Sequence, residues 1–232
     1  MGFYEHKRFK EGKLMALIQR YGNFGIYWGD EQNSSHALNL IQMQINATYI
    51  YNYLIAQGWT VNAICGILGN MEWESSINPG RWEGDNVGIG PGYGLVQWTP
   101  FTNYTQWSGI VGDYSTMDNN LGRIMYELAN NIQYYATTDY PLSFSQFTTS
   151  TQTPYYLACA FAWNYERSAI VISGTEQQKE ALRQRRGSSA NNWYAYLTGS
   201  PPPTPPTPTP VANKNKHFNF VLFNYRRTHG KR

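Results

Sequence analysis

Residues 60–98 read TVNAICGILGNMEWESSINPGRWEGDNVGIGPGYGLVQW and combine an apolar helical pattern, two glutamates and a glycine-rich turn. Thr60 is a good N-cap, and apolar residues follow it at spacings of three and four, which predicts a helix from residue 60 to about residue 73. These apolar residues are Ile64, Ile67, Leu68 and Met71. The stretch therefore predicts a helix with one buried face that runs directly into an irregular segment.

Glu74 lies at the end of that predicted helix, three positions after Met71 and seven after Ile67, so it projects beside the apolar stripe. A carboxyl group held there resists ionisation, and cleavage of a glycosidic bond needs such a protonated acid near neutral pH. Glu74 is therefore the candidate catalytic acid. Glu72 competes with it, because it follows Leu68 by four positions; for either residue, a solvated charge at the helix end is the other interpretation.

The segment after Glu74 is too rich in Gly, Pro and Asn for a helix, which predicts a loop or a small β-hairpin beside a cleft. It carries two acidic residues, Glu83 and Asp85. A retaining glycosidase needs a second carboxylate as nucleophile and an inverting one needs a general base, so either residue is a candidate second catalytic group. The sequence does not choose between them, and both are equally interpreted as loop charges.

Four motifs resemble the phage tail lysozyme family in their order and spacing. They are GNMEWES at residues 69–75, INPG at residues 77–80, GYGLVQWT at residues 92–99 and NYER at residues 164–167. Members of this family are tail-tip peptidoglycan hydrolases of small short-tailed phages, and the resemblance runs from about Ile41 to Leu197. It implies a lysozyme-like α+β domain that cleaves the β-1,4 bond between N-acetylmuramic acid and N-acetylglucosamine, with Glu74 and not Glu72 as the catalytic acid.

Two alternatives to a muramidase remain open. Residues 94–97 also resemble the Gly-Leu-Met-Gln turn of lytic transglycosylases, with Val96 in place of Met, so a transglycosylase acting on the same bond is the first alternative. A non-catalytic glycan-binding tail protein is the second, because it would explain the aromatic residues without Glu74. We expect no metal or other cofactor, because the histidines lie outside the motifs without paired ligand spacing: His6, His36, His217 and His229.

The chain has 8 tryptophans and 19 tyrosines, whose ring faces and polar tips suit stacking on sugars, although most of them must serve the core. Gln97 can offer a donor and an acceptor to an N-acetyl group, and Tyr165 can bond the catalytic acid or a sugar. For the charges next to Tyr165, the favoured interpretation is a Glu166–Arg167 ion pair. The expected substrate-binding residues are Trp73, Trp82, Tyr93, Gln97, Trp98 and Tyr165.

Further helical patterns predict a mainly α catalytic domain over residues 36–199, with the small β or loop insert described above. The predicted helices run from Ser34 or Ser35 to Gln57, from Asp118 to about Tyr134, from Thr153 to about Trp163, and from about Thr175 to Leu197 with a break near Gly187; a short helical turn surrounds Phe144 and Phe147. Cys65 and Cys159 fall in apolar helical stretches and are expected to be reduced core thiols.

The ends of the chain differ from this domain in composition. Residues 1–35 form a mixed basic segment without a readable function, residues 200–210 alternate proline and threonine as a semi-rigid linker, and residues 211–232 form a basic aromatic tail. Six of the 18 basic residues and no acidic residue lie in this tail, so 12 basic and 15 acidic residues remain and the rest of the chain carries about −3. The tail is expected to dock on phage tail proteins, with a disordered basic end as the equal alternative; nucleic-acid binding ranks low.

The expected location of the protein follows from two features that the sequence is predicted to lack, a signal peptide and a membrane span. The N-terminus lacks the pattern of a signal peptide, and no apolar run approaches the roughly eighteen to twenty residues that a membrane span requires. A cell-wall hydrolase without an export signal must be carried to its substrate. We therefore expect a virion component of the phage tail that acts on the host wall during entry and has no membrane partner.

Overall fold

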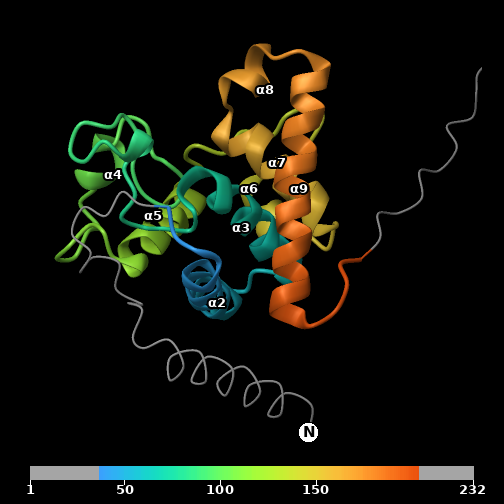
Figure 1. The fold of residues 1–232 in the computed structure, drawn as a ribbon, viewed down its shortest axis with the longest axis horizontal. Coiled ribbons are helices and arrows are strands. Elements are labelled where there is room, and N and C mark those ends of the chain that lie inside the picture. The colour runs from blue at the N-terminus through green and yellow to red at the C-terminus, as the bar shows by residue number, and fades with distance from the viewer. Residues whose placement is uncertain (1–36, 204–232) are drawn as a thin grey trace, which may run out of the picture.

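The computed structural model describes residues 37–203, and the architecture of this part is mainly helical with almost no strand (Figure 1). Its centre is α3 (Val61–Ser75), which packs together with α7 (Pro154–Phe161) and the long α9 (Glu176–Thr198). The predicted mainly α class is confirmed. The predicted segment 1–35, the tail and most of the linker lie outside the described residues.

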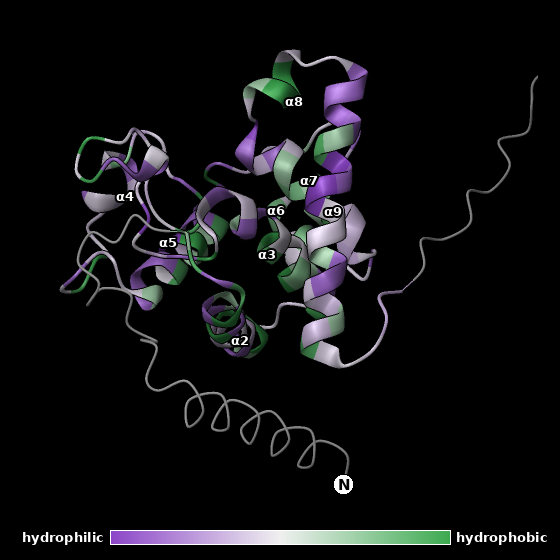
Figure 2. Ribbon diagram, viewed as in Figure 1, coloured by the Kyte–Doolittle hydropathy of each residue, from purple (hydrophilic) through white to green (hydrophobic). Residues whose placement is uncertain are grey.

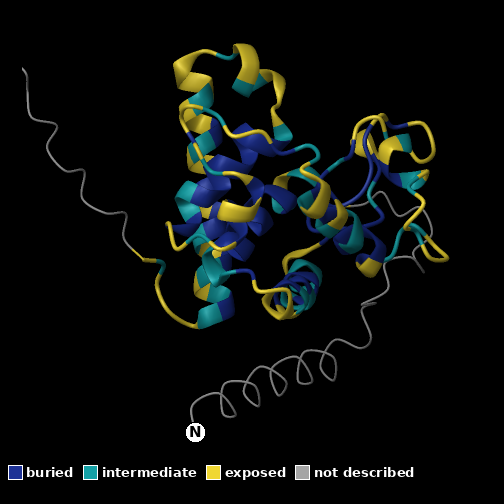
Figure 3. Ribbon diagram, turned by 180° about the vertical axis from the view of Figure 1, so that it is seen from behind, coloured by how far each residue is buried: buried dark blue, intermediate teal, exposed yellow. Residues whose placement is uncertain are grey.

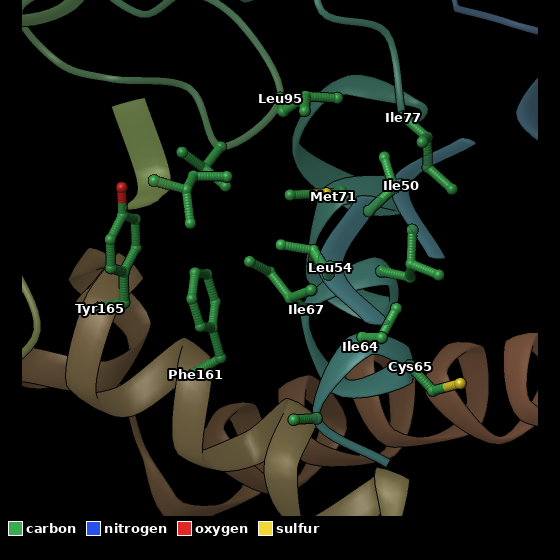
Figure 4. Packing of buried hydrophobic residues seen from close by; sticks show 14 of the residues in the cluster. Ile50, Leu54, Ile64, Cys65, Ile67, Met71, Ile77, Leu95, Phe161 and Tyr165 are labelled. Carbon is green, nitrogen blue, oxygen red and sulfur yellow. The ribbon is translucent and has the colours of Figure 1, made fainter. Parts of the chain in front are cut away.

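The central helix α3 follows its predicted pattern closely. The Thr60 side chain accepts a hydrogen bond from the Ala63 amide at 3.2 Å, so the predicted N-cap is confirmed. All four residues of the predicted apolar stripe are fully buried. Figure 4 shows Ile64, Ile67 and Met71 of this helix meeting Ile50 and Leu54 on one side and Phe161 on the other. The helix therefore enters the site region from a rigid core.

Close approach between α3 and α9 depends on Gly69. A Cβ atom at this position would lie 2.6 Å from the Arg186 carbonyl oxygen and 2.8 Å from the Ala190 amide nitrogen, which is closer than real contacts allow. Only glycine lets the two backbones meet here. This contact brings Arg186 of α9 next to the carboxyl end of α3, where Glu74 lies.

The helix before α3 begins later than predicted. α2 (Leu40–Ala56) is capped by Asn39, whose side chain and that of Gln42 form a reciprocal capping box, so the predicted start at Ser34 or Ser35 is wrong. Its inward face buries Ile50 and Leu54 against α3. Figure 2 shows the mixture of hydrophobic and polar residues along α2, as expected for a helix with one buried face.

Two other predicted helices are present in the structure, one of them shorter than predicted. α5 (Met117–Asn130) is capped by Thr116 and stops at Asn131, which has left-handed geometry, so the predicted extension to Tyr134 is wrong. The short predicted turn of helix is confirmed as α6 (Phe144–Thr148). Residues between α3 and α5 form the insert, which holds the 3₁₀ turn η1 (Glu83–Asp85) and the short α4 (Thr102–Thr105).

The insert contains no strand, contrary to one form of the prediction. It has two isolated antiparallel bridges, from Tyr93 to Trp82 and from Tyr93 to Trp98. Tyr104 stacks on Tyr93 with ring centroids 5.9 Å apart and on Trp98 at 4.5 Å. A small aromatic core thus holds this irregular segment, and Figure 3 shows buried residues inside its exposed outer loops.

The predicted helix at Thr153–Pro154 is confirmed as α7, which continues without interruption into a π-helical turn, η2 (Ala162–Glu166). A wide turn of this kind often marks a functional site, because it redirects side chains out of the regular helical register. Here it places Tyr165 and Glu166 beside the insert. The short α8 (Ala169–Ser173) then leads to α9.

The last helix is continuous, so the predicted break near Gly187 is wrong. A Cβ atom at Gly187 would overlap the ring of Tyr155 in α7, which means that this glycine serves close packing of α7 on α9 and not a break. Cys65 and Cys159 are both buried, and neither forms a disulfide within the described residues, in agreement with the predicted core thiols.

Candidate functional site

The site is built around the carboxyl end of α3. Arg186 donates through Nη1 to the Asn70 carbonyl oxygen at 3.1 Å and through Nη2 to Glu74 Oε1, and the side chain of Glu74 is only 21% exposed. Burial raises the pKa of Glu74 above its ordinary value, the charge and hydrogen bond of Arg186 oppose this rise, and the nearby charge of Glu83 adds to it. The prediction that Glu74 sits beside apolar residues thus missed its ionic partner.

Glu74 lines a cavity of about 610 Å³ between the end of α3, the insert and the segment that follows η2. Three different parts of the chain therefore contribute acidic, aromatic and amide side chains to one concave surface, as is usual for a ligand site. The lining residues are Trp73, Glu74, Arg81, Glu83, Gly84, Pro91, Gln97, Thr99, Glu166, Ser168 and Ala169.

The two candidate second carboxylates occupy different places. Glu83 lines the cavity, and a Cβ atom on Gly92 would lie 2.7 Å from its Oε2, so glycine leaves room for the carboxylate there. Asp85 is absent from the lining and pairs instead with Arg81 at 3.4 Å. The structure therefore brings Glu74 and Glu83 to one cavity and leaves Asp85 outside it.

Gln97 faces the same cavity in a constrained conformation. Its φ is 51°, and its Nε2 donates to the carbonyl oxygens of Gly94 at 2.9 Å and of Arg81 at 3.2 Å. Its buried Oε1 has no hydrogen-bond partner within residues 37–203. An oriented amide with a free acceptor suits the N–H of an N-acetyl group.

The turn that carries Gln97 is tied to two helices. The Ser75 hydroxyl at the end of α3 donates to the Leu95 carbonyl oxygen at 3.0 Å. The Leu95 amide donates to Asn120 Oδ1 of α5 at 3.0 Å. Because Ser75 directly follows Glu74, this bond fixes the position of the candidate acid relative to the turn.

A second cavity of about 360 Å³ adjoins the first and shares Gln97, Thr99 and Glu166 with it. Its floor holds the buried carboxylate of Glu127. This group accepts hydrogen bonds from Tyr165 at 2.5 Å and from Trp98 Nε1 and Arg123 Nε at 2.9 Å. Burial raises the pKa of Glu127, and these hydrogen bonds and the charge of Arg123 lower it in part.

The aromatic residues expected to contact sugar fall into different environments. Trp73 is 49% exposed and lines the first cavity, while Trp98 is buried but lines the second. Trp82 and Tyr93 are buried in the aromatic core of the insert and line neither cavity. Tyr165 lines the second cavity and bonds Glu127, so the hydrogen bond considered between Tyr165 and the catalytic acid is not formed.

Glu72, Glu166 and Arg167 also lie in surroundings that differ from those expected. Glu72 accepts a hydrogen bond from Trp193 Nε1 at 2.8 Å and lines neither cavity. The predicted Glu166–Arg167 ion pair is wrong for the described part of the chain, because Arg167 turns outward and lies over the ring of Tyr135, 4.5 Å from its centroid. Glu166 stays in the cleft between the two cavities.

Sequence reasoning missed Arg186 and Glu127, although a signal for each exists. Arg186 lies four residues after Leu182 and four before Ala190, both buried, so it occupies an apolar position of α9. Glu127 lies three residues after the buried Ile124 of α5. A charged residue at a buried helical position points to a specific partner, because isolated charges are costly to bury.

Two further observations concern the described residues. Within residues 37–203, no group of three or more His, Cys, Asp or Glu side chains is arranged to hold a metal ion; all four histidines lie outside the described ranges. None of the helices in this part combines the length and the apolar character needed to cross a membrane.

Comparison with known proteins identifies a family and a curated relative. A family model described as phage tail lysozyme matches residues 45–197, a range that contains every residue of both cavities. The chain is also 43% identical over 166 residues to morphogenesis protein 1 of Bacillus phage B103. This alignment covers 70% of the chain and 42% of that relative, so the chain spans less than half the length of the curated protein it matches.

Proposed function

Because the chain belongs to the phage tail lysozyme family, we propose that it is a peptidoglycan hydrolase of a phage tail. The proposed reaction is that of a muramidase, hydrolysis of the β-1,4 bond between N-acetylmuramic acid and N-acetylglucosamine. In this role, the protein opens the cell wall during host entry.

One observation carries this proposal: Glu74 and Glu83 approach the same cavity from separate segments. Glycoside hydrolysis needs two carboxyl groups with different proton affinities on the two sides of the bond. Glu74 is the more buried of the two, and burial favours its protonated form. Glu83 is an exposed residue at the rim.

The proposed chemistry assigns each group a step. Glu74 gives its proton to the leaving oxygen as the bond from that oxygen to the anomeric carbon breaks. Glu83 takes a proton from the attacking water or stabilises the positive charge at the anomeric carbon. Gln97 accepts a hydrogen bond from the N-acetyl group, and the exposed face of Trp73 offers a stacking surface to a sugar ring.

The exposure of Glu83 favours a second candidate function. A lytic transglycosylase needs only one acid/base and forms an anhydro sugar without consuming water, so an exposed second carboxylate is compatible with it. Mass spectrometry of muropeptides from purified peptidoglycan separates the two reactions. Reducing N-acetylmuramic acid ends are expected, anhydro ends would establish the transglycosylase, and glycan binding without any new ends would establish a non-catalytic tail protein.

We further propose that residues 211–232 attach the enzyme to the virion. The support is the sequence alone, in which Phe218, Phe220, Leu222 and Tyr225 lie between basic residues on both sides. Truncation after Pro210 tests this proposal. The shortened enzyme is expected to lyse isolated walls normally and to be missing from purified particles, and normal incorporation would rule the attachment out.

A further inference from the structure

Glu166 occupies an unusual position at the end of the π-helical turn η2. It lines both cavities and so lies where they join. Its Oε1 is buried and has no hydrogen-bond partner within residues 37–203, and no ion pair involves it there. In an ionised carboxylate, Oε1 would have neither water nor a hydrogen-bond donor to replace its hydration, which favours the neutral acid.

The charges around Glu166 explain why no cation neutralises it. Arg186 is the cation that acts on it, but this guanidinium already bonds Glu74 and the Asn70 carbonyl oxygen. Arg123 is engaged with Glu127. The titratable and charged groups that face Glu166 or its two cavities are Glu74 of α3, Arg81 and Glu83 of the insert, Arg123 and Glu127 of α5, Tyr165 of η2 itself and Arg186 of α9.

The charge of one guanidinium thus acts on two carboxyl groups, Glu74, which it bonds, and Glu166, which lines the same cavity as Glu74. Its single positive charge balances one carboxylate, and the second is stable there only with a proton. We propose that Glu166 is a positioning residue that shares one proton with Glu74 near neutral pH and so keeps the acid form of Glu74 accessible beside Arg186. This role rests on the proposed function only where it concerns catalysis; the shared proton itself does not depend on it.

The electrostatics agree with this arrangement. Burial, followed by the charge of Glu74, holds the pKa of Glu166 well above its usual range, and Arg186 opposes the shift. When two such groups interact strongly, their protons leave in two steps that belong to the pair. Between these steps the pair holds one proton, which is distributed between Glu74 and Glu166, so a constant fraction of Glu74 is protonated across that pH range.

The first test compares the pH dependence of wall lysis in the wild type and in Glu166→Gln, whose amide keeps the shape of a neutral acid. With Glu166 replaced, Glu74 alone binds the proton, and its acid form falls about tenfold per pH unit above its own midpoint. The alkaline limit of lysis, which is the pH above which lytic activity is lost, is therefore expected to be lower in the variant. Activity is expected to recover at acid pH. An unchanged limit would overturn the proposal.

The second test needs no activity and is valid even if the protein is not a hydrolase. Carboxyl ¹³C NMR of glutamate-labelled protein follows both groups during titration, with signals assigned by Glu74→Gln and Glu166→Gln. Glu74 is expected to show two titration steps in the wild type and one step in Glu166→Gln, and Glu166 is expected to titrate at lower pH in Glu74→Gln. The control is Glu176→Gln, which removes an exposed glutamate at the start of α9 and should leave both curves unchanged.

Independent single-step titrations of Glu74 and Glu166 would contradict the shared proton. Absence of lysis in a wild type that shows two-step titration would instead contradict the proposed function and leave the pairing established. The two failures are therefore distinguishable.

Discussion

Arg186 bonds Glu74 although the two residues lie 112 positions apart in the chain. The contact depends on the close approach of α3 and α9 at Gly69, five residues before Glu74. A positive charge at this position favours the carboxylate form of Glu74, whereas the proposed role of Glu74 requires its acid form. Burial and the charge of Glu83 supply the opposing influence, so the site balances one cation against burial and a neighbouring carboxylate.

The positions of Glu83 and Asp85 predict different effects on turnover when each candidate second carboxylate is replaced. Glu83→Gln is expected to lower turnover on peptidoglycan by at least about a hundredfold, the typical contribution of a positioned base. Asp85→Asn should have a small effect, because Asp85 pairs with Arg81 outside the cavity lining. Steady-state rates on soluble glycan fragments measure both variants. Wild-type rates in both would favour the single-acid transglycosylase route.

Gly92→Ala tests the position of Glu83 without changing its chemistry. The added Cβ would lie 2.7 Å from Glu83 Oε2 and 3.1 Å from Gln97 Oε1, so both side chains must move. Turnover is expected to fall at least about tenfold, because a displacement of the order of 1 Å is costly in catalysis. Gly122→Ala is the matched control, since its Cβ would meet only ordinary contacts at 3.6 Å or more. Equal turnover in the two variants would contradict this geometry.

Tyr165→Phe removes the 2.5 Å hydrogen bond to the buried carboxylate of Glu127. The expected loss is about 1.5 to 3 kcal/mol of unfolding free energy, the range for hydrogen bonds to charged groups. Urea unfolding measures it. Tyr126→Phe, at an exposed tyrosine on the same helix as Glu127, should change stability far less. Similar small losses in both variants would show that the hydrogen bond from Tyr165 to Glu127 contributes little to the unfolding free energy.

The raised pKa of Glu166 predicts how stability depends on pH. A carboxyl group whose pKa is higher in the folded than in the unfolded protein stabilises the fold fully below the unfolded value, about 4.3 for Glu, and this contribution is lost as pH rises through the folded value. Glu166→Gln removes that loss. The variant is therefore expected to gain unfolding free energy relative to wild type between pH 5 and pH 8, as followed by urea unfolding. A difference that is the same at both pH values would mean that Glu166 does not retain its proton.

Local signals made most of the helices predictable. Thr60 and Thr153 cap helices because their side chains satisfy free amides at a helix start, a property that depends on near neighbours in sequence. Gly187 misled the prediction, because its role is contact with Tyr155 of another helix, and sequence spacing carries no information about such contacts. For the same reason the sequence does not connect Arg186 with Glu74.

The candidate site was predictable to a similar extent. The sequence points to the motif around Glu74 and to the turn at Gln97, and both line one cavity. Trp82 and Tyr93 show the limit: an aromatic residue in a loop suits a sugar site and a small core equally well, and only the packing with Tyr104 and Phe101 reveals the second role.

The central claim is that Glu74 is the catalytic acid, and lysis of purified walls by Glu74→Gln measures it most directly, with Glu72→Gln as the matched control from the same helix. Glu74→Gln is expected to lose at least about a hundredfold in rate and to keep its folded structure and glycan binding, because the amide preserves shape and lacks the proton. Glu72→Gln should retain most activity, since Glu72 bonds Trp193 outside both cavities. Wild-type lysis by Glu74→Gln, or a larger loss in Glu72→Gln, would contradict the account.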